Sequence, residues 1–144
     1  RGATPGEVVV QTLLPEAPVL QAAAAQDFAG FAATELEERR AAGFPPYARL
    51  VLLRWRGQDE EAVALAAQRG VELLLPGANG QLGVLGPAPA PLARLRGYYR
   101  YQALLRSASA QSLHRTVGER LGRLRLACPS AVDLTVNVDP LTLM

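Results

Sequence analysis

Apolar residues recur at two different spacings along this chain, and each spacing predicts one kind of element. Between residues 132 and 138, apolar and polar residues strictly alternate, which is typical of a strand with one buried face. A helix is predicted where apolar residues recur at intervals of three and four, at Leu113, Val117, Leu121 and Leu124. Ser109 is placed to cap this helix at its start, and Pro129 ends it.

The same two spacings occur earlier in the chain. Strands are predicted at residues 48–56, at 81–86 and at about 98–106. A helix lies between the first two strands, because Asp59 and the two glutamates after it suit a helix N-terminus. Its apolar face consists of Val63, Ala66, Ala67, Gly70 and Leu74.

From residue 47 onward, the predicted order is therefore β-α-β-β-α-β. This is the ferredoxin-like split β-α-β pattern, an α+β fold. Two helices pack on one face of a four-stranded antiparallel sheet. The other face is expected to be open, and such faces often contact RNA or DNA.

The first third of the chain has a different pattern. Residues 7–12 are predicted to form a short buried strand, and residues 22–42, which contain no proline, a helical stretch. Gly43 ends that helix, and Pro45 and Pro46 prevent it from resuming. We therefore expect one segment at residues 1–46 and a separate domain at residues 47–144.

Charge is distributed unevenly, although the net charge is only +2. All fifteen basic residues are arginine. Residues 1–83 carry a net charge of −3, whereas residues 84–144 carry eight arginines and three acids, a net of +5. Between Gly86 and Cys128 the only acid is Glu119. This asymmetry favours an anionic partner for the second half.

The most informative segment is a predicted proline-spaced loop from residue 84, which leads into the strand that begins near Tyr98. Arginine binds phosphate through its planar fork, and tyrosine offers a face on which a base can stack. Alternation places Tyr99, Tyr101, Ala103 and Leu105 in the core and the intervening side chains toward solvent. The predicted DNA contacts are Arg94, Arg96, Tyr98, Arg100, Gln102 and Arg106.

Two alternatives stay open for this basic segment. The arginines can form a solvated edge whose charge prevents aggregation between sheets, or they can bind a protein. Asp133, Thr135, Asn137 and Asp139 share one side of the last strand, and we expect them to pair with arginines such as Arg49 or Arg54 and not to bind a metal.

No catalytic motif is present in the chain. It contains neither a GxxxxGK[ST] phosphate loop nor HExxH or GxSxG. His114 stands alone and is expected to be a partly exposed helix residue, and Cys128 a small buried one. A single cysteine excludes an internal disulfide, and no apolar run is long enough to span a membrane. We expect a reduced, cytoplasmic fragment of a longer protein.

Four segments resemble the C-terminal part of the primosomal replication-restart helicase family, PriA (primosomal protein N-prime). The most specific is the segment at 84–102, which is close to the family's G-P-x-x-A-P…L-R-G-x-[YF]-R-[YW]-Q signature. The segment at 35–47 resembles its E-x-x-x-R-x-x-x-x-[YF]-P-P-[FY] junction, and 136–140 its terminal V-D-V-D-P. Residues 5–12 are similar to the strand after the last helicase motif.

This resemblance implies that residues 1–46 are the tail of the second helicase lobe with a connecting helix, and that residues 47–144 are the C-terminal domain. In the family, the parent protein is an ATP-dependent 3′-to-5′ DNA helicase that also holds zinc, and both ATP and zinc would bind outside this chain. The C-terminal domain would recognise branched and single-stranded DNA at stalled forks, together with other primosome proteins.

The resemblance also implies a docking site for the acidic tail of single-stranded DNA-binding protein. Some family members place an arginine and a glutamine one turn apart at the start of the last helix, at positions occupied here by Ala110 and His114. Arg106 or Arg115 would supply the missing guanidinium, so His114 and Arg115 are the predicted partner-binding residues. A pure protein-interaction module and a ribosome-like RNA-binding domain stay open as alternatives.

Overall fold

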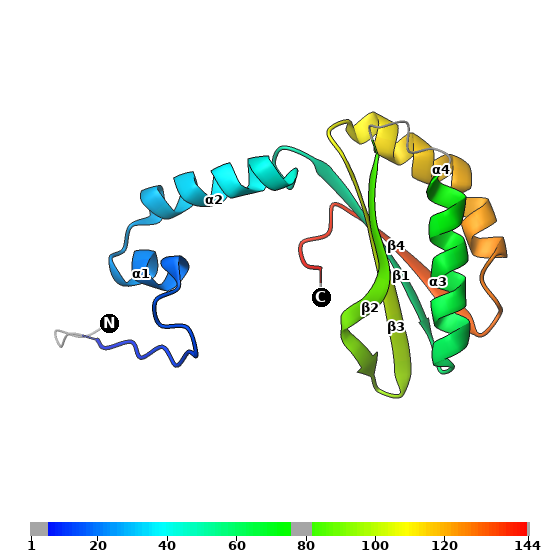
Figure 1. Ribbon diagram of the computed structural model, residues 1–144, viewed down its shortest axis with the longest axis horizontal. Coiled ribbons are helices and arrows are strands. Elements are labelled where there is room, and N and C mark those ends of the chain that lie inside the picture. Colours follow the sequence, from blue (N-terminus) through cyan, green and yellow to red (C-terminus); the bar gives the residue numbers. More distant parts are fainter. Residues whose placement is uncertain (1–5, 76–81, 144) are drawn as a thin grey trace. The chain divides into compact units, whose positions relative to one another are not determined.

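The computed structural model describes residues 6–75 and 82–143. Within it the chain divides into two compact units, the first ending at Glu38 and the second beginning at Arg39 (Figure 1). The second unit holds the sheet. Its elements are β1 (Arg49–Gly57), α3 (Glu60–Leu74), β2 (Gly83–Leu95), β3 (Tyr98–Ser107), α4 (Ala110–Leu126) and β4 (Val132–Val138).

The four strands form one antiparallel sheet in the order β2-β3-β1-β4. Helices α3 and α4 both lie on the same face of this sheet (Figure 1). The order of elements and the order of strands are those of the split β-α-β fold, so the fold predicted from the sequence is confirmed.

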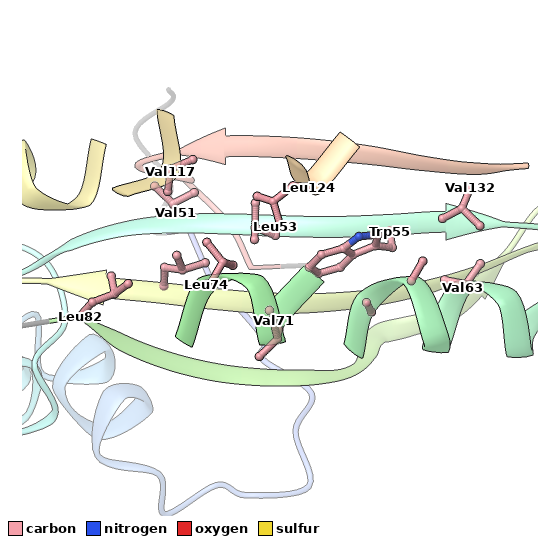
Figure 2. Packing of buried hydrophobic residues seen from close by; sticks show 14 of the residues in the cluster. Val51, Leu53, Trp55, Val63, Val71, Leu74, Leu82, Val117, Leu124 and Val132 are labelled. Atoms are coloured by element: carbon pink, nitrogen blue, oxygen red, sulfur yellow. The ribbon is translucent and has the colours of Figure 1, made fainter. Parts of the chain in front are cut away.

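The core lies between the sheet and the two helices (Figure 2). Every second residue of β1 points into it, and Val51, Leu53 and Trp55 are fully buried. The face of α3 predicted from helical spacing is buried as expected, at Val63, Ala66, Ala67, Gly70 and Leu74.

The predicted helix ends in the second unit are also confirmed. The Asp59 side chain accepts a hydrogen bond from the Ala62 amide at 3.1 Å, and the Ser109 side chain accepts one from the Ser112 amide at 3.2 Å. These caps satisfy amides that have no partner within the first helical turn. Gly43 ends α2 (Phe28–Ala42) with a φ of 64°, a conformation that glycine adopts readily.

The proline-rich segment was predicted to be a loop. In the structure it is instead part of β2, which runs from Gly83 to Leu95. Within the described sheet, β2 pairs only with β3. Proline lacks an amide hydrogen and is tolerated at such an edge, because no ladder bond is needed on its outer side. The pairing shifts register between Leu85 and Ala88 and again between Pro89 and Arg94.

An open sheet face opposite the helices was predicted from the sequence, but the structure shows this face partly covered. Leu50, Leu52 and Leu104 are buried there, and Phe44 and Leu143 pack against them. The Gln102 side chain also donates a hydrogen bond to the Leu143 carbonyl, at 3.4 Å. Alternation gave the direction of these leucines correctly, but it contains no information about the residues that cover them.

The first unit departs from prediction in two places. Residues 7–12 form no strand and are not buried, since Val8 and Val9 are 88% and 85% exposed. The expected single helical stretch is two helices, α1 (Pro18–Ala24) and α2, separated at Gln26 with a φ of 56°. Asp27 starts the second helix by accepting a hydrogen bond from the Gly30 amide at 2.9 Å.

Candidate nucleic-acid interface

The turn between β2 and β3 places arginine and tyrosine side chains at one end of the sheet. Arg96 and Gly97 connect Leu95 to Tyr98 and both have positive φ, 52° and 84°. Two such residues suit a tight hairpin, because their twist matches that of the strands. A left-handed conformation costs a non-glycine residue about 1–2 kcal/mol, and Arg96 adopts it with its side chain exposed. We call residues 94–99 the hairpin tip.

The two faces of the hairpin tip each carry an arginine over a tyrosine. Arg94 is the cross-strand partner of Tyr99, and its guanidinium carbon lies 5.1 Å from the centroid of that ring. Tyr98 points to the opposite face, because consecutive strand residues alternate. On that face the guanidinium carbon of Arg56, from β1, lies 3.9 Å from the Tyr98 ring centroid.

Arg56 and the two arginines of the hairpin tip are available to an anionic partner. Arg56, Arg94 and Arg96 are exposed, and in residues 6–75 and 82–143 none of the three forms a salt bridge. A salt bridge elsewhere in the second unit joins Arg49 Nη1 to Asp139 Oδ2 at 3.4 Å, which confirms one of the pairings predicted for the last strand.

Arg100 lies on the same face as Tyr98 but is only 7% exposed. The prediction that its side chain faces solvent is therefore wrong. Leu104, predicted to face solvent as well, is buried. Arg100 is the cross-strand partner of Arg56. Burial, and secondly the charge of Arg100, lower the pKa of Arg54 on the same face. An anion bound near Arg54 and Arg100 would relieve the repulsion between these two cations.

The remaining predicted DNA contacts lie progressively farther along β3 from the hairpin tip. Gln102 is half-buried in the middle of the strand, against Leu143. Arg106 is near its far end, where Nη1 donates a hydrogen bond to the Ala42 carbonyl in the last turn of α2. The structure therefore brings together Arg94, Arg96 and Tyr98, but not all six residues.

Arg56 belongs to this surface and was missed from the sequence. Alternation along β1 places it on the same face as Leu50 and Leu52. This signal was present, but its use requires knowing that β1 lies beside β3 with Gly57 opposite Tyr99. Only that register places Arg56 diagonally across from Tyr98.

The predicted partner-binding residues lie at the other end of the unit. His114 and Arg115 are exposed on α4, which follows the end of β3 remote from the hairpin tip. The expectation that His114 is an exposed helix residue is confirmed. An open cleft of about 290 Å³ lies before this helix. It is lined by Gly43, Tyr47, Ala48, Leu82, Gly83, Arg106, Ser107 and Ala108.

Other chemistry-bearing groups do not converge on the hairpin tip. Cys128 is half-buried after α4, its Sγ lies 3.3 Å from the Leu124 carbonyl oxygen, and burial raises the pKa of its thiol. Among the described residues, no three histidine, cysteine or acidic side chains are grouped so that they could ligate a metal. None of the described helices combines the length and the apolar character that crossing a membrane requires.

Comparison with known proteins agrees with the resemblance seen in the motifs. The family model described as "Primosomal protein N C-terminal domain" matches residues 40–141. Proteins named "Replication restart protein PriA" are similar over nearly the whole chain. The one from Synechocystis is 39% identical over 99% of this chain and 17% of its own length. The corresponding values are 32%, 96% and 17% for Thermotoga maritima, and 30%, 94% and 18% for Haemophilus influenzae.

The chain thus spans less than a fifth of the length of these relatives. The matched residues cover the whole sheet with both of its helices. They also include the hairpin tip and the start of α4. The chain belongs to the primosomal protein N C-terminal domain family.

Proposed function

We propose that residues 47–144 are the DNA-binding and partner-docking domain of a replication-restart protein, and that they recognise branched DNA at stalled forks. The relatives are named as replication restart proteins. The observation that carries the DNA contact is the hairpin tip, where exposed Arg94 and Arg96 have no carboxylate partner among the described residues. Such cations displace counterions from phosphates, which drives association.

The arrangement at Tyr98 changes how a base would be held. The Arg56 guanidinium already covers one side of the tyrosine ring, at 3.9 Å from its centroid. Unpaired bases stack on guanidinium planes as well as on aromatic rings. A base at the fork would therefore stack on Arg56, with Tyr98 holding that side chain in place from behind.

Fluorescence anisotropy tests the proposal with forked, single-stranded and duplex DNA at two or more salt concentrations. Replacing Arg94 and Arg96 with alanine together should weaken fork binding. It should also flatten the log–log salt dependence by about one unit for each lost phosphate contact. Arg69→Ala, at an exposed arginine in the second half of α3, is the matched control. Unchanged affinity and slope in the double variant would refute the proposal.

A second candidate function is a protein-interaction module for the acidic tail of single-stranded DNA-binding protein. It is supported by the cleft beside Arg106 and by the exposed His114 and Arg115 on the helix that follows. Competition separates the two functions. Because this surface lies away from the hairpin tip, the tail peptide and forked DNA should bind the chain at the same time. If only the peptide binds, this second function alone remains. A strong preference for RNA over forked DNA would instead favour a ribosome-like RNA-binding domain.

We propose further that residues 1–46 are the end of a helicase lobe and that the parent protein is a cytoplasmic, ATP-dependent DNA helicase. Its ATP and zinc sites would be formed by other parts of that protein. The exposed apolar side chains of Val8, Val9 and Phe28 support this assignment. Surfaces of this kind are typical of segments that pack against further protein.

A further inference from the structure

The hairpin tip has two opposite faces of the same chemistry. Arg94 and Tyr99 form a pair on the helix side of the sheet, and Arg56 and Tyr98 form a pair on the other side. Arg96 lies at the turn between them. A surface that contacts a single phosphate backbone needs only one such face, so the duplication indicates two backbones.

The hairpin tip is too short to reach both backbones of a linear duplex from within one groove. The β1 strand ends at Gly57, opposite Tyr99, so that only residues 95–98 of the hairpin continue beyond its pairing with β1. One residue pair and a turn extend about 7 Å at about 3.4 Å per residue. The major groove is about 8.5 Å deep. At the base of the tip β1 ends at Gly57, and α3 begins three residues later.

We propose that the hairpin tip divides the two arms of a branched DNA, with Arg94 holding the backbone of one arm and Arg56 that of the other. This inference rests on the proposed DNA-binding function and deepens it. A fork presents two backbones that diverge, and the space between them admits a two-sided edge. On the Arg56 side, the nearby charges of Arg54 and Arg100 add to the positive potential. Asp133 is the cross-strand partner of Arg56, but among the described residues the two form no salt bridge.

A two-sided site has a distinctive energetic signature. A fork contacts both faces at once, whereas a linear duplex contacts one face at a time. Loss of either face should therefore reduce fork affinity, while duplex affinity changes little because the other face still binds. In a one-sided site, only substitutions on the binding face would lower affinity, and they would lower it equally for forked and for duplex DNA.

The test uses the 144-residue chain with forked DNA and with a linear duplex of matched sequence and length. The variants are Arg56→Gln and Arg94→Gln, with Arg69→Gln as the charge-matched control on an exposed helix surface. Each tip variant should lower fork affinity about tenfold, the value of one charge-assisted contact, and duplex affinity by less than about twofold. The fork-to-duplex preference should fall toward one, and the control should keep it.

Three results would overturn the inference. The first is a wild-type chain with no preference for forks; the second is a loss confined to one tip variant and equal for both DNAs. The third comes from photocrosslinking: a benzophenone side chain placed at position 56 or 94 should mark different arms, and marking of the same arm from both positions excludes a divider. If the Arg94 and Arg96 double alanine variant still weakens DNA binding in these cases, DNA binding through the hairpin tip survives. If the wild-type chain binds neither DNA, that function fails with the inference.

Discussion

Trp55 on β1 packs against Gly70 on α3 so closely that position 70 has no room for a side chain. A Cβ atom built at Gly70 would lie 3.1 Å from Trp55 Cε2 and 3.3 Å from Cη2, and closer still to Cζ2. Trp55 is fully buried at the centre of the core (Figure 2). The contact therefore fixes how near α3 approaches the sheet behind the hairpin tip.

Gly70→Ala should destabilise the fold despite the better helix propensity of alanine. Alanine gains about 1 kcal/mol over glycine inside a helix, but overpacking a core costs typically 1–3 kcal/mol. A rigid indole cannot move aside cheaply, so we expect a net loss in the free energy of unfolding measured by urea denaturation. The matched control is Gly118→Ala in α4, where nothing lies within 4 Å of the new Cβ. It should stabilise by about 0.5–1 kcal/mol, and a loss at position 118 as large as at 70 would contradict this account.

Asp139 links the end of β4 to the start of β1. Its carboxylate lies 3.4 Å from Arg49 Nη1 and accepts a hydrogen bond from the Leu50 amide at 3.4 Å, and its own φ is 47°. Asparagine adopts positive φ and keeps an acceptor oxygen, whereas alanine does neither. Asp139→Asn should therefore cost less than about 1 kcal/mol, the usual range for an exposed ion pair. Asp139→Ala should cost about 1–2 kcal/mol more because of the strained backbone.

Salt separates the two contributions at Asp139. Both side chains of the ion pair are substantially exposed, so added salt screens it. The difference between wild type and Asp139→Asn should shrink at high ionic strength, and the further difference between asparagine and alanine should stay. Equal stabilities for Asp139→Asn and Asp139→Ala would show that the backbone conformation contributes nothing.

The sequence contains enough local information to predict the fold of residues 39–144, but not the surface of the sheet. Caps at Asp59 and Ser109 and a helix stop at Gly43 are local signals, and each marks the end of an element correctly. The extent of β2 could not be predicted in the same way. Its prolines are compatible with a strand only at an edge, and the edge position depends on the whole topology.

The candidate site shows the same division between local and long-range information. Arg94, Arg96 and Tyr98 are near one another in the chain, and they are together in space at the hairpin tip. Arg56 is remote in sequence and joins them only through the pairing of β1 with β3. The burial of Arg100 likewise follows from cross-strand packing, which alternation along one strand cannot reveal.

Arg106 should stabilise the last turn of α2. Its guanidinium donates a hydrogen bond to the Ala42 carbonyl. The last carbonyls of a helix have no amide donor within the helix itself, so this bond supplies one. Arg106→Met keeps much of the apolar stem but removes this donor. Hydrogen exchange should then become faster at the Gly43 and Phe44 amides, which bond to carbonyls of that turn at 3.2 and 2.8 Å. Arg115→Met serves as the control, and unchanged exchange at both amides would contradict the role assigned to Arg106.

Cys128 should behave as a protected thiol with a shifted pH dependence. Burial raises the pKa of its thiol, an effect partly opposed by the Trp55 side chain. Since the folded state holds the proton more strongly than the unfolded state, the resulting stability is fully present below the ordinary thiol pKa of about 8.5 and is lost as the pH rises through the raised value. The free energy of unfolding should therefore fall from about pH 8 upward more steeply in wild type than in Cys128→Ala. Alkylation by iodoacetamide at pH 8 should be slower in the folded chain than in urea. Equal rates in the two states would show that the thiol is not buried and that its pKa is not raised.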